Sequence, residues 1–504
     1  MSQQLHKAIY FDDYQSDSGK NKSFTIAFNE DEAAIYKKIR VMSSYEIKRL
    51  IECQSYAELK GKADADGRPV NQYVKRVIGA KIKLVKKPAI QTKDVTFGNS
   101  KDIPFQRWYP YIEGYSPNFV KSLVQSYCPN AELIYEPFAG TGTTLFTADM
   151  MGIDTVYSEV NPLLRYLIKA KIEMMQLPSD QRILLANELR VLGTDLFSTL
   201  SKHKPNKQLK QNYFNVFGKS VYFPEDQLDL ILRLRTYLDS LMDAGKSKLA
   251  MLLDIAVFSC LIPVSYLKKQ GDLRFKTEKE KLSEMQTLQG TLPRKLKQIV
   301  EDVENLDFRI EQSHQLLSVN AKNIGSVTSD RLIDAVITSP PYLNGTNYFR
   351  NTKLELWFLG YLETDKDLRT FRDEALTSGI NDVKLGFSED SPVNCSKTFN
   401  STIVDLEDKA YDRRIPVMAK CYFNEMYEVF SGLTNHLRDN ADILVDLGDS
   451  IFSGVHIPTD KILVETINAF GFILKKRIVL RQRRSRNGEL LSQVLLVIKY
   501  NKKS

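Results

Sequence analysis

Residues 131–162, AELIYEPFAGTGTTLFTADMMGIDTVYSEVNP, decide the fold of this chain. A short apolar strand runs into a turn that contains Gly140 and Gly142, a helix follows, and a second strand ends near Glu159. Glycine allows the backbone to turn sharply between a strand and a helix, and it leaves N–H groups open to a ligand. The stretch therefore predicts a strand–helix–strand unit of a parallel sheet.

More strands are predicted late in the chain, whereas the middle of the chain is mostly amphipathic helix. The late apolar runs are LIDAVITS at 332–339, ADILVDLG at 441–448, FILKKRIVLRQ at 472–482 and SQVLLVIKY at 492–500. The last two are spaced for a hairpin. Residues from about 172 to 310 carry little strand signal. We expect an α/β fold with a large helical insertion.

Composition places the chain among ordinary globular proteins. Hydrophobic residues make up 43% and charged residues 26%, and the net charge of +8 suits a polyanionic partner. The five cysteines form no CxxC pair and the five histidines show no metal-ligand spacing, so no metal site is expected. The acidic start resembles no signal peptide, and the apolar window 249–267 contains Asp254 and Pro263. It is interpreted as a buried helix, so no membrane association and a cytoplasmic location are expected.

The two acidic residues around the glycine turn favour one kind of cofactor. Glu159 follows Gly142 by seventeen residues, at the end of the next strand, where a carboxylate can accept both hydroxyls of a ribose. Glu136 would repel a pyrophosphate and attract an amine. S-adenosylmethionine therefore fits better than a dinucleotide. A glycine turn can also exist for geometry alone, and that alternative remains open.

The segment TSPPYLNGTNYFR at 338–350 follows an apolar strand and is the most specific local feature. Two prolines fix the backbone and remove two N–H donors, which leaves nearby carbonyl groups available as acceptors. A serine hydroxyl, a carbonyl and the ring of Tyr342 could hold a planar amine. The alternative is a strand that ends at proline with a packed tyrosine.

These motifs together resemble the S-adenosylmethionine-dependent DNA amino-methyltransferases of restriction-modification systems, in the group whose catalytic motif is Ser-Pro-Pro-Tyr. The resemblance covers roughly 104–171 and 312–500. Here Glu136 replaces the usual Asp and Thr141 the usual Ser of the glycine motif. The resemblance implies a Rossmann-like methyltransferase fold, with a mostly parallel seven-stranded sheet and an antiparallel last strand.

The resemblance also implies the roles of single residues. The expected catalytic residues are Ser339, Pro340, Pro341 and Tyr342. The expected residues of the S-adenosylmethionine site are Ser116, Glu136, Pro137, Phe138, Ala139, Gly140, Thr141, Gly142, Thr143, Thr144, Glu159, Asn161 and Asn320. Asn320 stands where the family often has an Asp that binds the adenine amine, and an amide can still make that bond.

The implied reaction is direct attack of an exocyclic amine on the methyl group of the cofactor. Ser339 and the carbonyl of Pro340 would accept hydrogen bonds from the amine, while Tyr342 holds the extruded base. Carbon-5 methylation is disfavoured because no cysteine follows a proline. In this family Ser-Pro-Pro-Tyr usually accompanies methylation of cytosine N4, and Asp-Pro-Pro-Tyr that of adenine N6. We therefore expect cytosine-N4 methylation, with adenine-N6 methylation as the alternative.

Basic residues predict the contacts with double-stranded DNA. The run KKRIVLRQRRSR at 475–486 has seven basic residues in twelve and could track phosphates at a hairpin tip. Polar residues that follow the catalytic turn could instead steady the flipped nucleotide or cap the next helix. The expected DNA-binding residues are Asn344, Asn347, Tyr348, Arg350, Lys475, Lys476, Arg477, Arg481, Arg483, Arg484 and Arg486.

Four segments are expected along the chain. They are an N-terminal extension at 1–101 with candidate DNA contact, the first part of the methyltransferase domain at 102–171, a mainly helical insertion at 172–311 that is a candidate for target recognition, and the second part at 312–504 with a polar insertion at about 362–415. The basic run 75–87, KRVIGAKIKLVKK, is interpreted as a strand. It would be either a solvated edge strand or a phosphate-contacting patch.

Other functions remain possible on the sequence alone. An RNA base methyltransferase can use a similar proline turn, although no RNA-binding module is recognised here. A catalytically silent DNA-binding subunit could keep the fold, but the intact motifs argue against that reading. A cognate restriction endonuclease is a further expected partner.

Overall fold

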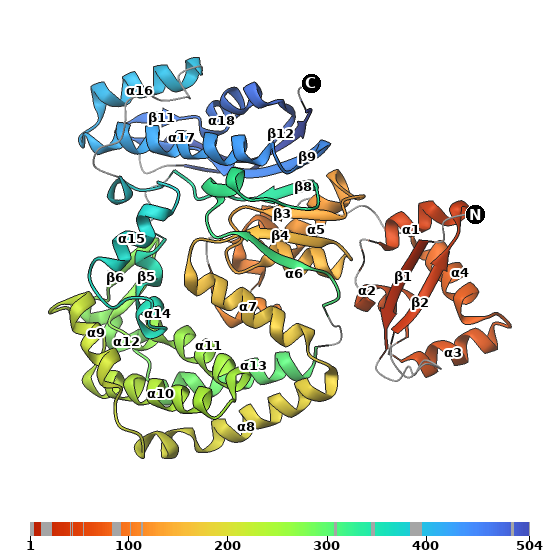
Figure 1. The fold of residues 1–504 in the computed structure, drawn as a ribbon, viewed down its shortest axis with the longest axis horizontal. Helices are drawn as coiled ribbons and strands as arrows, with labels where there is room; N and C mark the ends of the chain where they lie inside the picture. The colour runs from red at the N-terminus through yellow and green to blue at the C-terminus, as the bar shows by residue number, and fades with distance from the viewer. Residues whose placement is uncertain are drawn as a thin grey trace.

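A central seven-stranded sheet organises the protein, as seen in a computed structural model of the chain (Figure 1). The structure describes residues 5–11, 23–40, 42, 44–53, 55–82, 92–100, 102–111, 114–306, 310–343, 348–383, 396–484 and 488–502. The strand order is β12-β13-β9-β8-β3-β4-β7. In chain order the strands are β3 (Leu133–Glu136), β4 (Asp154–Ser158), β7 (His314–Ser318), β8 (Ile333–Thr338), β9 (Leu437–Gly448), β12 (Phe472–Arg484) and β13 (Leu490–Tyr500).

The strand directions confirm the expected Rossmann-like sheet. The pairs β7–β4, β4–β3, β3–β8 and β8–β9 are parallel. The last strand, β13, lies between β9 and β12 and is antiparallel to both. Because parallel strands end at one edge, the residues that follow β3, β4 and β8 come together there.

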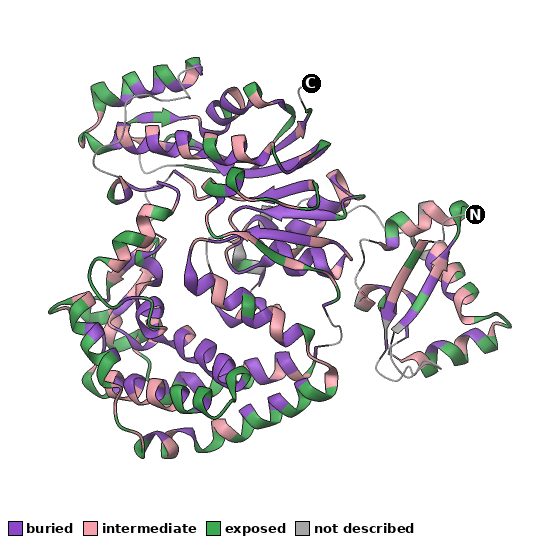
Figure 2. Ribbon diagram, viewed as in Figure 1, coloured by how far each residue is buried: buried purple, intermediate pink, exposed green. Residues whose placement is uncertain are grey.

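Helices cover both faces of the sheet, so its inner strands β3, β8, β9 and β13 are mostly buried, whereas most residues of the edge strand β12 are exposed (Figure 2). On one face α5 (Pro117–Tyr127) and α6 (Thr143–Met150) pack with Ile134 and Leu444. On the other face α17 (Arg414–Leu433) and α18 (Thr459–Ile467) pack with Ile443 and Val494. Burial on both faces explains why inner strands such as β3 and β8 are apolar runs in the sequence.

The insertion between β4 and β7 is a helical body with one core. Its elements, starting from α7, are α7 (Pro162–Gln176), α8 (Ser179–Ser201), α9 (Lys207–Phe217), α10 (Glu225–Asp243), α11 (Ser247–Val264), α12 (Glu278–Glu284) and α13 (Leu288–Glu304). Among the described residues α11 is long and apolar enough to cross a membrane, but 72% of it is buried in the protein. It is the buried helix that the apolar window predicts.

A hairpin that the sequence does not predict interrupts this helical body. It consists of β5 (Leu267–Gln270) and β6 (Asp272–Phe275), joined by Gly271 at φ +77°. The strands are only four residues long, so their alternation is too short to recognise. Buried Leu267 and Leu273 anchor the hairpin to the insertion.

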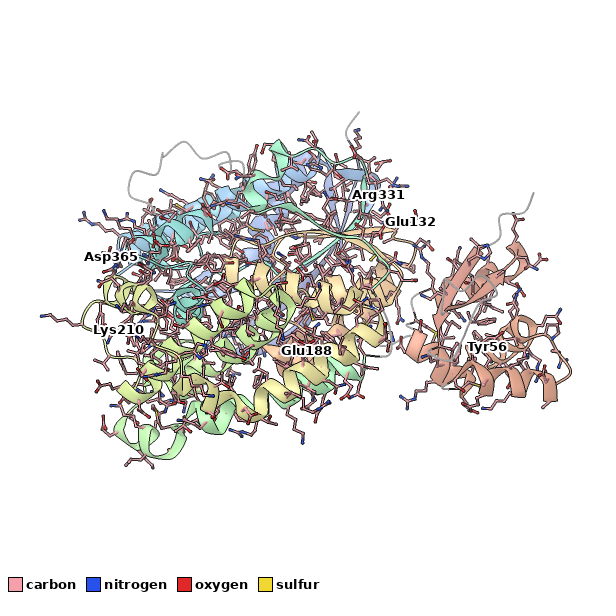
Figure 3. The ribbon with its side chains drawn as sticks, turned by 60° about the horizontal axis from the view of Figure 1, so that its bottom comes forward. Tyr56, Glu132, Glu188, Lys210, Arg331 and Asp365 are labelled. Carbon is pink, nitrogen blue, oxygen red and sulfur yellow. The ribbon has the colours of Figure 1, made fainter. Side chains whose placement is uncertain are left out.

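The N-terminal residues form a separate unit with its own core. Its elements are β1 (Leu5–Tyr10), β2 (Ser23–Phe28), α1 (Ala33–Ile39), α2 (Ser44–Ile51), α3 (Tyr56–Ala65) and α4 (Val70–Ile82). In Figure 3 this unit carries Tyr56 and stands beside the rest of the protein, with Glu132 and Arg331 on the facing edge. One contact across the boundary is the bond from Arg40 Nη2 to the Ala131 carbonyl, 2.8 Å long.

The expected strand at 75–87 is wrong, because residues up to Ile82 belong to helix α4. Val74 and Ile78 are four residues apart and fully buried, which is the spacing of one helix face. Packing of that face outweighs the strand preference of the valines and isoleucines. Residues 83–87 lie outside the described residues.

The part of the chain after β8 contains several smaller elements. After the Ser-Pro-Pro-Tyr turn come α14 (Lys353–Phe358), α15 (Asp367–Glu374) and α16 (Lys397–Lys409), and a short hairpin of β10 (Ser450–Phe452) and β11 (Val455–Ile457) follows β9. The expected polar insertion at 362–415 thus includes α15 and α16.

Candidate active site

A cavity of about 450 Å³ opens at the carboxyl ends of β3, β4 and β8. The glycine turn and the Ser-Pro-Pro-Tyr turn both line it, although about 200 residues separate them in the sequence. The parallel strands bring the two turns to one edge. This edge of the sheet is therefore the candidate active site.

The two glycines of the first turn serve different purposes. Gly142 has φ +84° and precedes α6, and a Cβ there would lie 2.6 Å from Cε2 of Phe146. Gly140 has φ +55° and lines the cavity, where a Cβ would lie 3.2 Å from Cε1 of Tyr111. Packing of α6 therefore requires a glycine at position 142. At position 140, glycine leaves only the backbone, without a side chain, beside the cavity.

Glu159 joins the end of β4 to the glycine turn. Its Oε2 accepts a hydrogen bond from the backbone N–H of Gly140 at 2.7 Å, and its Oε1 accepts one from that of Asn161 at 2.8 Å. Burial raises the pKa of the Glu159 carboxyl to about 7. A buried carboxylate beside a cavity favours a ligand that supplies donors, such as a pair of hydroxyl groups.

Glu136 lies at the end of β3 in a buried network of hydroxyl groups. Its carboxylate accepts hydrogen bonds from Thr144 Oγ1 at 2.8 Å and from the hydroxyl of Tyr115. Burial raises the pKa of Glu136 to about 7, while these bonds act in the opposite direction. Tyr115 lines the cavity, whereas its neighbour Ser116 accepts from the Phe119 N–H at 3.4 Å as the N-cap of α5.

The two asparagines predicted for the cofactor site line the cavity but also cap helices. Asn161 Oδ1 accepts from the Leu163 N–H at 3.0 Å, and its Nδ2 donates to Thr352 Oγ1 at 3.1 Å. Asn320 Oδ1 accepts from the Lys322 N–H at 3.0 Å, and its Nδ2 donates to the carbonyl of Glu374 at 2.7 Å. The adenine-binding role of Asn320 stays a prediction.

The other predicted cofactor residues are neighbours on the glycine turn. Those that line the cavity are Pro137, Phe138, Ala139, Thr141, Thr143 and Thr144.

The Ser-Pro-Pro-Tyr turn brings all four residues predicted to be catalytic to the cavity: Ser339, Pro340, Pro341 and Tyr342. Ser339 Oγ donates to the Tyr342 hydroxyl at 3.3 Å. The Tyr342 ring packs on Gly448, where a Cβ would lie 3.1 Å from the ring. The ring is therefore held by backbone beneath it and by hydrogen bonds at its hydroxyl.

Two polar residues of this network were not predicted from the sequence. Gln493 Nε2 donates to the Tyr342 hydroxyl at 3.0 Å and to both carboxylate oxygens of Asp446 at 2.9 Å. Burial raises the pKa of Asp446 to about 7. Asp446 is a charged residue inside the apolar run ADILVDLG, and this break in the run is the sequence signal for a functional role. Its contact with Gln493 could not be predicted, because that contact depends on the register between β9 and β13.

The predicted DNA-binding residues divide into two groups. Tyr348, Arg481 and Arg483 line the cavity, and Arg481 lies opposite Gln493 in the β12–β13 register. The exposed residues that do not line it are Arg350, Lys475, Lys476, Arg477 and Arg484.

Several of these exposed cations have partners in the protein. Arg477 Nε pairs with Asp460 at 2.5 Å, Lys476 lies over the Tyr127 ring, and Arg484 donates to the carbonyl of Gly488. The predicted residues Asn344, Asn347 and Arg486 lie outside the described residues.

The residues present fit an adenosine-containing cofactor with an amino group. Gly140 brings no side chain to the cavity wall, Glu159 lines the cavity, and Glu136 supplies a second carboxyl group that is buried at the end of β3. Within the described part of the chain, no group of three or more His, Cys, Asp or Glu side chains is arranged to hold a metal ion.

Comparisons with known proteins agree with this arrangement. No protein-family model matches the chain. The type II methyltransferase M.BsoBI of Geobacillus stearothermophilus is 23% identical over 80% of this chain and 85% of its own length. The type II methyltransferase M.AvaI of Nostoc sp. is 24% identical over 87% of this chain and 94% of its own length. The resemblance to restriction-modification methyltransferases is therefore confirmed.

Proposed function

We propose, from this relation to type II methyltransferases, that the protein methylates DNA at a specific site, with S-adenosylmethionine as the methyl donor and the N4 amine of cytosine as the acceptor. It would be the modification enzyme of a restriction-modification system, with a nuclease of the same specificity as its counterpart. The observation that carries the proposal is the single cavity shared by the glycine turn and the Ser-Pro-Pro-Tyr turn.

S-adenosylmethionine, when bound, supplies an electrophilic methyl group on a sulfonium centre. The glycine turn and Glu159 would hold its nucleoside, and the buried carboxyl group of Glu136 would favour its positively charged end. Glu159, which follows β4, lines the cavity, whereas Glu136 is buried at the end of β3 and is not one of the lining residues. The neighbouring turn at the end of β8 is left for the acceptor base.

Ser339 and Tyr342 would hold the acceptor. The Ser339 oxygen has lone pairs free for the amine while its proton bonds to Tyr342, and the carbonyl of Pro340 has no competing N–H from Pro341. The ring of Tyr342 would stack on the extruded base. These contacts fix the amine in line for attack, which is the main contribution of such a site.

Asp446 would assist by positioning Tyr342. The Tyr342 hydroxyl donates to Asp446, and Gln493 bridges the same two side chains. A carboxyl group with a pKa near 7 can also take up the proton that the methylated amine releases. The charge of Arg481 near Asp446 favours its ionised form.

The base assignment rests on Ser339 alone. Because a serine hydroxyl is neutral, the motif offers one acceptor without the charge that an aspartate would bring. Adenine N6 remains the alternative acceptor, since its amine has the same hydrogen-bonding groups.

The test is nucleoside mass spectrometry of DNA and of RNA after incubation with the pure protein and methyl-labelled S-adenosylmethionine. We expect N4-methylcytosine in DNA, loss of label with Ser339→Ala, and normal label with Ser326→Ala, an exposed serine before the same strand. N6-methyladenine would overturn the base assignment, and label in RNA alone would overturn the DNA substrate. No label despite cofactor binding would favour a catalytically silent subunit.

A further inference from the structure

The hairpin β5–β6 reaches the active-site cavity from the helical insertion. Lys269 and Gly271 of this hairpin line the cavity beside the residues of the glycine turn. The tip is held in place by Asn351, whose Oδ1 accepts from the Leu273 N–H at 3.0 Å and whose Nδ2 donates to the Gly271 carbonyl at 2.9 Å. Asn351 is only 2% exposed, so the hairpin has a built attachment at the site.

Lys269 lies on the cofactor side of the cavity. Its Nζ lies 5.7 Å from the centroid of the Tyr111 ring. Tyr111 in turn packs against Gly140, where a Cβ would lie 3.2 Å from its Cε1 atom. One aromatic ring therefore separates the ammonium group from the turn that would bind the cofactor.

The other cations of the cavity lining have different surroundings. The described lining contains Lys269, Lys322, Arg481 and Arg483. Lys322 Nζ donates to Glu425 at 2.9 Å and to the carbonyl of Ala375 at 2.8 Å. Arg481 belongs to the catalytic side, opposite Gln493. Lys269 is the cation that reaches the glycine turn through the ring of Tyr111.

A methionine-derived cofactor brings a carboxylate as well as a positive sulfonium and amine. The glycine turn has acidic partners for positive groups, because Glu136 and Glu159 are both buried there. A carboxylate placed near them needs a cation, since an unpaired charge is costly in a partly buried site. Lys269, a half-buried residue of the cavity lining, meets that need.

We propose that Lys269, from the inserted hairpin, binds the carboxylate of the cofactor. This assignment rests on the proposed function, because it requires S-adenosylmethionine as the ligand of the cavity. It makes the insertion part of the cofactor site rather than a target-recognition region alone. Lys269 also lies near buried Glu355 and lowers its pKa, so the test must separate ligand binding from a structural role.

The test compares the affinities of two ligands for matched variants by isothermal titration calorimetry on the full chain. The ligands are S-adenosylmethionine and decarboxylated S-adenosylmethionine, which keeps the amine and the sulfonium. The variants are Lys269→Gln, Lys269→Arg as charge rescue, and Lys268→Gln as control. Lys268 is the adjacent residue of β5, pairs with Glu280 and Glu284, and is absent from the cavity lining.

Loss of one charge-assisted hydrogen bond should raise the Kd for S-adenosylmethionine about 5- to 20-fold in Lys269→Gln. Its Kd for the decarboxylated ligand should stay at the wild-type value, Lys269→Arg should recover most of the affinity, and Lys268→Gln should match the wild type. Equal weakening of both ligands would show a structural role and overturn the proposal. Unchanged cofactor affinity with weaker DNA binding would assign Lys269 to a phosphate instead.

The two proposals fail in different ways. A wild-type protein that binds no S-adenosylmethionine would refute the proposed function itself. A wild-type protein that binds the cofactor and methylates DNA, with Lys269→Gln equal to Lys268→Gln, would refute only the role of Lys269.

Discussion

At the residue level, the ring and the hydroxyl of Tyr342 make different contacts and can be tested separately. The ring packs on Gly448, and the hydroxyl accepts from Ser339 and Gln493. Removing the ring in Tyr342→Ala should lower kcat/KM for DNA about 100-fold, because base stacking is lost. Tyr342→Phe keeps the ring and should retain at least about tenfold more activity than the alanine variant.

Steady-state kinetics with labelled cofactor measures this difference, and cofactor affinity should be unchanged in both variants. Equal losses in the two variants would mean that the hydroxyl network, and not stacking, is what Tyr342 contributes.

The buried carboxyl groups predict how stability depends on pH, and Glu355 is a suitable case. It is 1% exposed, accepts a bond from the Tyr109 hydroxyl at 2.9 Å, and has its pKa raised to about 7 by burial. Between an unfolded pKa of about 4.3 and that value, the folded state binds more protons than the unfolded state. The contribution of Glu355 to stability is therefore largest at low pH and falls as the pH rises through this window.

Glu355→Gln cannot ionise, so it should gain stability relative to the wild type between pH 5 and pH 8, by on the order of 1–3 kcal/mol. Urea denaturation at the two pH values measures the change, with Glu363→Gln on the surface as control. If the difference in unfolding free energy between Glu355→Gln and the wild type were the same at both pH values, the raised pKa of Glu355 would be contradicted.

At the level of elements, the glycine turn should tolerate no side chain at Gly142. Alanine there meets the left-handed backbone penalty of roughly 1–2 kcal/mol and also a clash with Phe146 and Ile168. Gly245, after α10, has φ +74° and nothing within 4 Å of a Cβ. Gly142→Ala should therefore lower the Tm more than Gly245→Ala and weaken cofactor binding, since only the first displaces the start of α6.

Differential scanning calorimetry gives the two Tm values, and titration gives the Kd for the cofactor. Equal Tm changes with unchanged affinity would mean that α6 adapts without moving the turn.

The strands and helices also show what the sequence could and could not predict. Strands buried on both faces, such as β3 and β8, are apolar runs that end in motifs, so the sequence predicts them and the turns after them. Helix α4 was misread because Val74 and Ile78 fit either structure until the packing partners are known. The β5–β6 hairpin is too short to show alternation.

The residues of the candidate site also divide into those that the sequence predicts and those that it does not. The turn residues are local in sequence and could be predicted. Asp446, Gln493 and Lys269 come from separate strands, and only the sheet register and the position of the insertion bring them to the cavity. Long-range pairing of this kind leaves no pattern in one sequence.

For the whole molecule, the structure divides the basic segment 475–486 by position. Arg481 and Arg483 lie at the cavity, whereas Lys475 and Lys476 lie further along β12 and do not line it. If DNA binds over the cavity, only Arg481 and Arg483 contact its phosphates. Each lost phosphate contact reduces the slope of log Kobs against log salt by about 0.9.

The double variant Arg481→Gln/Arg483→Gln should therefore lower that slope by about 1.8, while Lys475→Gln/Lys476→Gln, with the same loss of charge, should leave it nearly unchanged. Fluorescence anisotropy over a series of salt concentrations measures both. Because the net charge changes equally in the two variants, a long-range effect of charge would appear in both, and only local contact separates them. Equal slopes would mean that DNA runs along the whole of β12 and not over the cavity alone.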